Sequence, residues 1–348
     1  MEKKNDKSIT IYDIAREAGV SPSTVSRVLT NNANVKPEKK ERILELIEKY
    51  NFKPNAMARG LSENKSKVIG IVVADIRNPF YSQMYVACEE AAETLGYTVF
   101  LADSHSDINR EIEILDRLSN QRAEAVILIG GSVDQIDIDP SFYAKIKEIS
   151  KTTPIVTSTH VLEADNCFAI RIDESRCMTL LLQHLIDLGH SNIAVVGGRE
   201  AVSSTAEKLA QFRSLMNLYQ LPIDEEMVSK NGSYDPENGY ADMNKLFDAN
   251  KKPTAVIAIN DATAIGVMQS IREHGLRIPE DISVVGYDNT IYSKMANPRL
   301  TSIDYDYDTY GRKLVEMAVA AISGKQNIKL QIVDPKLVLR ESTATIRE

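Results

Sequence analysis

Apolar residues recur with helical spacing along the first fifty residues of the chain. In "TIYDIAREA", residues 10–18, four of them fall on one face of a helix: Ile11, Ile14, Ala15 and Ala18. Gly19 then permits the backbone to turn where a side chain would clash. Ser21 and Pro22 open a second helix, because serine caps free amides and proline loses nothing at the first helical position.

Two further features complete a small helical domain. The second helix turns three apolar residues inward: Val25, Val28 and Leu29. A third helix begins at Pro37 and packs through Ile43, Ile47 and Tyr50. Three helices around one core, with a tight turn between the first two, is the helix-turn-helix arrangement.

Beyond residue 67 the pattern changes to short apolar runs that alternate with amphipathic helices. The runs read as buried parallel strands: 68–75, 97–103, 124–130, 154–158, 192–198, 254–261 and 282–288. Helices are predicted between them: 80–95, 107–119, 174–188, 203–219, 236–248 and 261–274. This alternation predicts a doubly wound α/β fold. Two such sheets in sequence predict two lobes, with a ligand cleft at the carboxyl ends of the strands.

Composition narrows the class of protein. A chain of 348 residues with 43% hydrophobic residues can bury a large core and form more than one domain. Its three cysteines form no CxxC pair, which disfavours a disulfide framework and a zinc site. No signal peptide opens the sequence, and nowhere do about 18 apolar residues run together. We therefore expect a cytoplasmic protein without a metal or cofactor.

Charge is distributed unevenly along the chain. The first 67 residues hold 14 lysines and arginines against 9 acidic residues, although the whole chain holds 41 against 49. A basic head on an acidic body would present one end to DNA while the remainder is repelled by it. A chance fluctuation in surface charge is the alternative interpretation.

The second helix carries short hydroxyl residues and one arginine on its outer face: Ser23, Thr24, Ser26 and Arg27. Alanine or glutamate would form a better helix, so a requirement other than helix formation accounts for them. A helix that enters the major groove needs short side chains there, with polar groups for phosphates and base edges. Arg27 can bond the O6 and N7 atoms of guanine with both arms of its guanidinium group. Ordinary solvated helix caps are the alternative.

The stretch "TIYDIAREAGVSPSTVSRVLTNNANVKPEKKERILELIEKYNFKPNAMARGL" closely resembles the head of the LacI/GalR family of bacterial transcriptional repressors. The resemblance implies that Pro22, Ser23 and Arg27 read bases. It also implies that residues 54–61 form a hinge helix, which folds on the operator and pushes Leu61 into the minor groove. Such a segment is too short to be a stable helix alone, and a leucine on it suits a wedge between base steps. A linker leucine that rests on the core is the alternative.

The predicted organisation is a DNA-binding head over residues 1–52, a hinge helix and linker over 53–66, and a two-lobed effector-binding and dimerisation core over 67–348. The core resembles periplasmic binding proteins, whose lobes are joined by three crossovers. We expect a dimer, because one head covers only half of a palindrome, and no leucine-heptad tail for a tetramer follows. Contacts with double-stranded operator DNA are expected from these residues: Thr10, Ser21, Pro22, Ser23, Thr24, Ser26, Arg27, Asn34, Asn55, Ala58 and Leu61.

Polar and aromatic residues follow the predicted strands, where ligands bind in folds of this kind: Asp75, Asn78, Phe80, Asn260, Asp261 and Asp288. Carboxylates and amides there can hold sugar hydroxyls, while an aromatic ring covers an apolar face. Asp261 could equally cap the next helix. The resemblance assigns effector contacts to five residues: Phe80, Asn260, Asp288, Tyr305 and Tyr307.

Two positions depart from the sugar-binding members of the family. Where those members carry an arginine in an R-x-x-G-F/Y pattern, this chain has Lys208 in "KLAQF", and Thr159 stands where they often carry an aspartate. A lysine lacks the planar fork that grips neighbouring hydroxyls, and it suits a phosphate better. We therefore expect weak binding of free neutral sugars, with a sugar phosphate or a phosphorylated carrier protein as the controlling partner.

Three functions from different classes compete. The first is a transcriptional regulator of carbohydrate or related metabolic genes that is controlled by a small metabolite. The second is a solute-binding protein, which the basic head and the missing signal peptide disfavour. The third is an enzyme, but no dinucleotide, P-loop, nucleophile-elbow or metal-ligand motif occurs in the sequence. We expect the regulator, and not an enzyme.

Overall fold

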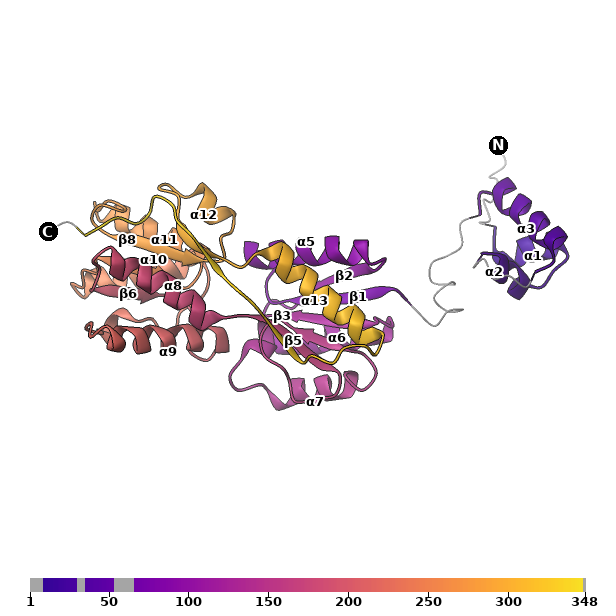
Figure 1. The fold of residues 1–348 in the computed structure, drawn as a ribbon, viewed down its shortest axis with the longest axis horizontal. Helices are drawn as coiled ribbons and strands as arrows, with labels where there is room; N and C mark the ends of the chain where they lie inside the picture. The colour runs from indigo at the N-terminus through magenta and orange to yellow at the C-terminus, as the bar shows by residue number, and fades with distance from the viewer. Residues whose placement is uncertain (1–8, 30–34, 53–65, 347–348) are drawn as a thin grey trace, which may run out of the picture. The chain divides into compact units, whose positions relative to one another are not determined.

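The computed structural model describes residues 9–29, 35–52 and 66–346, and the chain divides into two compact units (Figure 1). The first unit ends at Lys67 and the second begins at Val68. The three cysteines are free and buried: Cys88, Cys167 and Cys177. None of the described helices is both long enough and apolar enough to cross a membrane.

The described helices of the first unit are α1 (Ile11–Ala18), α2 (Pro22–Leu29) and α3 (Pro37–Lys49). They share one apolar core: Ile14, Ala15, Val25, Val28, Ile43 and Leu46. Gly19 adopts a left-handed conformation with a φ of 65°, which ends α1 and leads into the turn before α2. The predicted helix-turn-helix arrangement is confirmed, with Leu46 deeper in the core than Ile47 and Tyr50.

The first lobe of the second unit is built on a six-stranded parallel sheet with the order β10-β5-β4-β3-β1-β2. Its strands are β1 (Val68–Val73), β2 (Thr98–Asp103), β3 (Ala125–Ile129), β4 (Ile155–Thr157), β5 (Cys167–Ile172) and β10 (Leu330–Val333). Its helical segments are α5 (Pro79–Thr94), α6 (Ile108–Asn120), η1 (Gly131–Asp134), α7 (Pro140–Ile149) and α13 (Tyr307–Ile322). Helices α5 and α13 cover one face of this sheet, and α6 and α7 cover the other.

The second lobe is built on a five-stranded sheet with the order β11-β9-β8-β7-β6, in which β11 is antiparallel. Its strands are β6 (Ile193–Val196), β7 (Ala255–Ala258), β8 (Ser283–Tyr287), β9 (Thr301–Asp304) and β11 (Lys336–Val338). Its helical segments are α8 (Glu174–Asp187), α9 (Ser203–Leu218), η2 (Glu225–Met227), α10 (Pro236–Asp248), α11 (Asp261–Glu273) and α12 (Ile291–Met295). Helices α8 and α9 cover one face, and α10 and α11 the other.

Helices α10 and α11 approach each other so closely that two glycines are required. A Cβ atom on Gly239 would lie 2.1 Å from the carbonyl oxygen of Thr263, and one on Gly266 would lie 1.8 Å from that of Pro236. Any larger side chain would push the two helices apart.

The chain passes between the lobes three times (Figure 1), after Ile172, after Asp304 and after Val333. The long helix α13 therefore returns to the first lobe, and β11 closes the chain onto the sheet of the second lobe. The expected two-lobed doubly wound core with three crossovers is confirmed.

All of the predicted strands are present, but the pattern missed α7, α12, α13 and β5. Strand β5 reads "CFAIRI", and its apolar run is interrupted by Arg171, which faces the cleft between the lobes. Strand β9 is buried but begins with Thr301 and Ser302, and β10 and β11 are short and partly exposed. These final strands therefore lack the continuous apolar signal of the central strands.

Candidate functional site

The second helix of the head, α2, presents the polar face that the sequence predicted. Val25 and Val28 are buried beneath it, whereas Ser23 and Arg27 are exposed. Ser21 precedes the helix and caps it, because the amide of Thr24 donates to its Oγ atom at 3.3 Å. Pro22, Thr24 and Ser26 are half-buried beside this face.

The head also places a capped helix terminus at the start of α1. The hydroxyl of Thr10 donates to the carboxylate of Asp13 at 2.6 Å, and the amide of Asp13 donates back to Thr10 at 3.4 Å. Helix N-termini carry a partial positive charge and attract phosphate groups. Four expected DNA contacts lie outside the described residues: Asn34, Asn55, Ala58 and Leu61.

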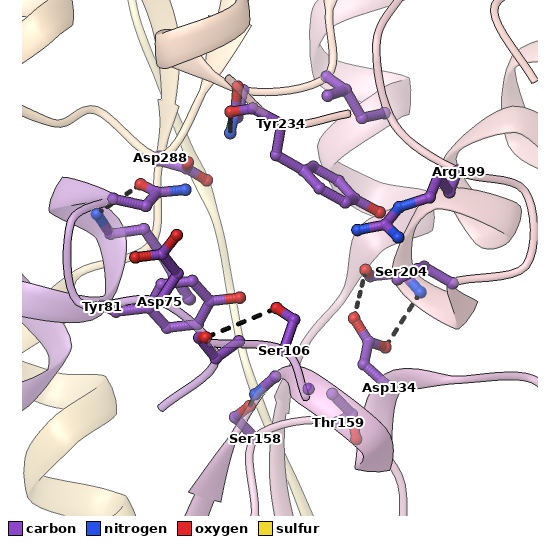
Figure 2. A pocket seen from close by; sticks show the side chains of 18 of the residues that line it. Asp75, Tyr81, Ser106, Asp134, Ser158, Thr159, Arg199, Ser204, Tyr234 and Asp288 are labelled. Carbon is purple, nitrogen blue, oxygen red and sulfur yellow. Dashed lines mark hydrogen bonds between the residues drawn. The ribbon is translucent and has the colours of Figure 1, made fainter. Parts of the chain in front are cut away.

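A cleft of about 950 Å³ lies between the two lobes of the second unit, at the carboxyl ends of the strands (Figure 2). Seven of the candidate effector residues line it: Asn78, Phe80, Thr159, Lys208, Asn260, Asp288 and Tyr305. Tyr307 is not part of the lining. Its ring packs on Phe80 with a centroid distance of 6.0 Å, and its hydroxyl donates to the carbonyl of Asp288 at 2.8 Å.

Aromatic side chains form one wall of the cleft. Phe80 and Tyr305 pack edge to face with ring centroids 6.0 Å apart. Sequence reasoning missed four further tyrosines in the lining: Tyr81, Tyr234, Tyr292 and Tyr310. Figure 2 shows Tyr81 and Tyr234 on opposite sides of the cavity. Tyr81 belongs to the amphipathic helix α5, and Tyr234 lies in the loop before α10, so neither ends a strand.

Lys208 is engaged by the protein itself. Its Nζ atom lies 3.4 Å from a carboxylate oxygen of Glu174 and 4.4 Å from the ring centroid of Tyr287. The side chains of the two charged residues are only 8% and 14% exposed. Burial raises the pKa of Glu174 against the opposing effect of Lys208. Burial lowers the pKa of Lys208, but the carboxylates of Glu174 and Asp288 raise it and prevail. Sequence reasoning missed Glu174.

Asp288 is a buried carboxylic acid in the wall of the cleft. It is 7% exposed and has no ion pair with any described residue. Its backbone has a φ of 92°, which turns the chain sharply at the end of β8. Burial, assisted by the nearby charge of Asp261, raises the pKa of Asp288 to about 8. The folded protein therefore holds this acid protonated at neutral pH.

Asp261 supports the loop that carries Asp288. It is fully buried, and its carboxylate accepts hydrogen bonds from the amide of Thr290 at 2.6 Å and from the hydroxyl of Ser302 at 2.6 Å. The cap of α11 is Asn260 instead, whose Oδ1 atom accepts from the amide of Thr263 at 2.8 Å. The sequence suggested that Asp261 either contacts the ligand or caps α11. The structure supports neither role, since Asp261 does not line the cleft and Asn260 is the cap.

Two other strand-end residues are also engaged locally. The Oδ1 atom of Asn78 accepts from the amide of Phe80 at 3.0 Å and caps α5. Asp75 receives both arms of the Arg77 guanidinium group at 2.8 and 2.7 Å, and this pairing lowers the pKa of the carboxyl group. Asp75 therefore offers only its remaining lone pairs to a ligand, whereas the cap of α5 leaves the side-chain NH2 group of Asn78 available as a donor.

Several contacts connect the two lobes, among them the ion pair of Arg171 on β5 with Glu207 on α9. Figure 2 shows another of these contacts, between η1 and α9. The carboxylate of Asp134, at the end of η1 in the first lobe, accepts from the hydroxyls of Ser203 and Ser204 at the start of α9 in the second lobe. The distance from the Ser204 hydroxyl is 2.7 Å.

The chain matches known proteins over both units. Residues 10–55 match the bacterial regulatory proteins of the lacI family, and residues 182–343 match the periplasmic binding protein-like domain. The chain is 33% identical over 298 residues to catabolite control protein A of Priestia megaterium, with 85% of this chain and 87% of that protein covered. It is 31% identical over 343 residues to the HTH-type transcriptional regulator DegA of Bacillus subtilis strain 168, with 97% and 98% covered.

A solved structure of the lac repressor dimer, bound to operator and to the anti-inducer ONPF, matches with a TM-score of 0.84 at 26% identity. That match covers 97% of this chain and 100% of the repressor chain. The head and the two-lobed core together define a DNA-binding transcriptional regulator. The chain belongs to the lacI family of bacterial regulatory proteins.

The buried pair of Lys208 and Glu174 predicts a strongly asymmetric mutational response. Lys208→Met leaves Glu174 buried without its cation, so we expect the free energy of unfolding to fall by about 3–5 kcal/mol. The double variant Lys208→Met, Glu174→Gln should recover most of this loss, because no uncompensated charge remains. Urea denaturation measures both. Arg312→Met, in an exposed pair with Glu316, is the control and should cost about 1 kcal/mol or less. A single variant as stable as the wild type would contradict the assignment.

The raised pKa of Asp288 predicts a pH-dependent stability. The unfolded chain releases this proton near the ordinary aspartate pKa of 3.8, whereas the folded protein holds it up to about pH 8. The free energy of unfolding should therefore fall as the pH rises through this window. Asp288→Asn removes that loss, so its advantage over the wild type should grow by on the order of 5 kcal/mol between about pH 4 and pH 8.5. Denaturant titrations across this range measure the difference.

Asp137→Asn, at an exposed position in the same cleft, is the control and should keep the wild-type pH dependence. A pH-independent difference for Asp288→Asn would show that the acid is ionised when folded.

Proposed function

We propose that this regulator binds a palindromic operator as a dimer, and that a small molecule in the cleft between the lobes changes its affinity for DNA. The observation that carries the proposal is the combination, in one chain, of an exposed polar face on α2 with a polar and aromatic cleft at the strand ends. The lac repressor structure supports both parts, since that protein is a dimer bound to operator and to an anti-inducer.

The contacts proposed for the head follow from exposure and position. Arg27 and Ser23 are exposed on α2 and would reach base edges. Thr10 and Ser21 stand at helix N-termini and would contact phosphates. Half-buried positions on the same helix would complete the surface: Pro22, Thr24 and Ser26. The contacts proposed for Asn34, and for the hinge residues Asn55, Ala58 and Leu61, stay predictions from the sequence, as do the boundaries of the 53–66 linker.

The proposed dimer face lies at one edge of the first lobe. Strand β2 is the edge strand of its sheet, and Phe100 on it is 46% exposed. Val86, on the adjoining helix α5, is 50% exposed. Large apolar side chains at an unpaired sheet edge are a liability for a monomer, so a second copy of the chain is the proposed cover.

The charges of the cleft favour a neutral or cationic effector. Its lining holds nine carboxylate residues against four arginines or lysines. Three of those cations are already paired with an acid: Arg77 with Asp75, Arg171 with Glu207, and Lys208 with Glu174. The fourth, Arg199, is exposed and lies over the ring of Tyr234. The phosphate assigned to Lys208 from the sequence would therefore meet a lysine that is already neutralised.

We propose roles for the candidate residues on this basis. Asp288 and Asn260 would bond hydroxyl or amino groups, and Phe80 and Tyr305 would pack against the apolar face of the effector. Lys208 would act through its pair with Glu174, and Tyr307 by positioning Asp288 through its carbonyl. Asn78 and Thr159 would shape the floor from the first lobe.

The base-reading role of Arg27 predicts a sequence-dependent loss of DNA binding. Arg27→Ala should weaken binding to the cognate operator by about 1–3 kcal/mol and relax the preference for one guanine in each half-site. Filter binding across operators substituted at that base measures both effects. Arg42→Ala, on α3 of the same head, is the control and should leave base preference unchanged. Equal losses on every operator would make Arg27 a phosphate contact.

The acidic cleft predicts the order in which matched ligands bind. Calorimetric titration of the full chain compares glucose, glucosamine and glucose 6-phosphate, which share one ring and differ in charge. We expect the phosphate to bind at least about tenfold more weakly than the other two, because the cleft carboxylates repel it. Tighter binding of the phosphate would return Lys208 to the role that the sequence suggested. A phosphorylated carrier protein, docking outside the cleft, is the alternative controller, and a binding isotherm with it alone would favour that function.

A further inference from the structure

The loop after β3 is held in place by Thr159, the position at which this chain departs from sugar-binding relatives. The hydroxyl of Thr159 donates to the carbonyl of Val133 at 3.1 Å. Val133 belongs to η1 and is fully buried in the core of the first lobe. Thr159 thus contributes its hydroxyl to the loop and not to the open part of the cleft.

A buried acid holds the same loop from the opposite side. Glu111 of α6 is 1% exposed, and its carboxylate accepts from the hydroxyl of Ser132 at 2.7 Å and from the amide of Ser132 at 3.2 Å. Gly131 leaves room for this carboxylate, since a Cβ atom there would lie 3.1 Å from it. The loop is therefore fixed on both sides before it reaches its last residue.

That last residue, Asp134, extends to the second lobe. Its Oδ2 atom accepts from the Ser204 hydroxyl at 2.7 Å, and its Oδ1 atom accepts from the Ser204 amide at 3.3 Å and from the Ser203 hydroxyl. A carboxylate at the N-terminus of a helix is favoured by the helix dipole. The neighbouring backbone continues the contact, because the amide of Ile136 donates to the carbonyl of Ala201 at 2.9 Å.

These contacts are separate from the three passages of the chain between the lobes, which follow residues 172, 304 and 333. The contact between η1 and α9 is thus a non-covalent connection that can open while the covalent ones persist. Figure 2 shows Asp134 and Ser204 meeting across the cleft that the candidate effector residues line.

We propose that Asp134 is a positioning residue that latches the two lobes together, with Glu111 and Thr159 holding its loop in place. The latch sets the balance between open and closed clefts and thereby the access of the effector. This last step rests on the proposed function, but the latch itself does not. In this chain the carboxylate that contacts α9 is that of Asp134, while Thr159 stands where sugar-binding relatives are expected to carry an aspartate.

Hydrogen exchange of the full chain, followed by mass spectrometry, tests the latch without any ligand. The informative amide is that of Ile136, because it bonds to the second lobe but not to Asp134. Asp134→Ala should raise the exchange rate of this amide about tenfold or more, since the lobes separate more often. Thr159→Val, which removes only the bond to Val133, should raise it by a smaller factor. Asp137→Ala, an exposed acid on the same loop, is the matched control and should match the wild type.

An unchanged rate at Ile136 in Asp134→Ala would overturn the latch and leave Asp134 as a cap of α9. An equal rise in Asp137→Ala would do the same, because any acid on the loop would then suffice. If Asp134→Ala fails to fold, Ser204→Ala removes the partner instead and should also raise the Ile136 rate. Failure of the proposed function gives a different result. The wild-type chain would then bind no operator, while the Ile136 exchange rate would still rise in Asp134→Ala.

Discussion

Three passages of the chain between the lobes constrain everything else in the core. Because the chain crosses after Ile172, Asp304 and Val333, neither lobe is made of one continuous segment, and the two cannot drift apart. One face of each sheet is covered by an apolar cluster that is confined to that lobe. A third cluster contains residues of both lobes. Relative motion is thereby confined to a hinge. Two bodies joined in this way form the kind of two-state element through which separate sites become coupled.

The buried charged residues of the cleft determine which ligands the two lobes can close around. In the cleft, the charge of Lys208 acts on two acids, Glu174 and Asp288. Lys208 pairs with Glu174, and Asp288 is neutral because it holds a proton. Such an arrangement contributes little net stability, because desolvation cancels most of the attraction. The pair contributes selectivity, since a ligand that brings a negative charge to Lys208 meets a cation already paired with Glu174. Asp261 stays out of this exchange because the loop amides and hydroxyls already satisfy it.

The sequence predicted the parts of the structure that depend on local pattern. Helical spacing, the turn at Gly19 and the apolar runs of the central strands specified the head and both sheets, and strand ends pointed to Asn260 and Asp288. What it missed depends on distant pairing. Glu174 is an unremarkable acid at the start of a helix until Lys208, 34 positions later, lies beside it. Asp134 follows no strand directly, and its partners on α9 belong to the other lobe. Neither relation leaves a periodic signal in the chain.

The glycine contact between α10 and α11 has a consequence for how tightly a ligand can be held. Gly239 and Gly266 lock the two helices together, and the amide of the Asn260 side chain donates to the carbonyl of Tyr234 at 3.0 Å, just before α10. Asn260 and Tyr234, on the second-lobe side of the cleft, therefore keep the same relative position whether or not the lobes have closed. Binding then loses little conformational entropy in ordering these two residues. A larger part of the free energy of each contact with them therefore contributes to affinity.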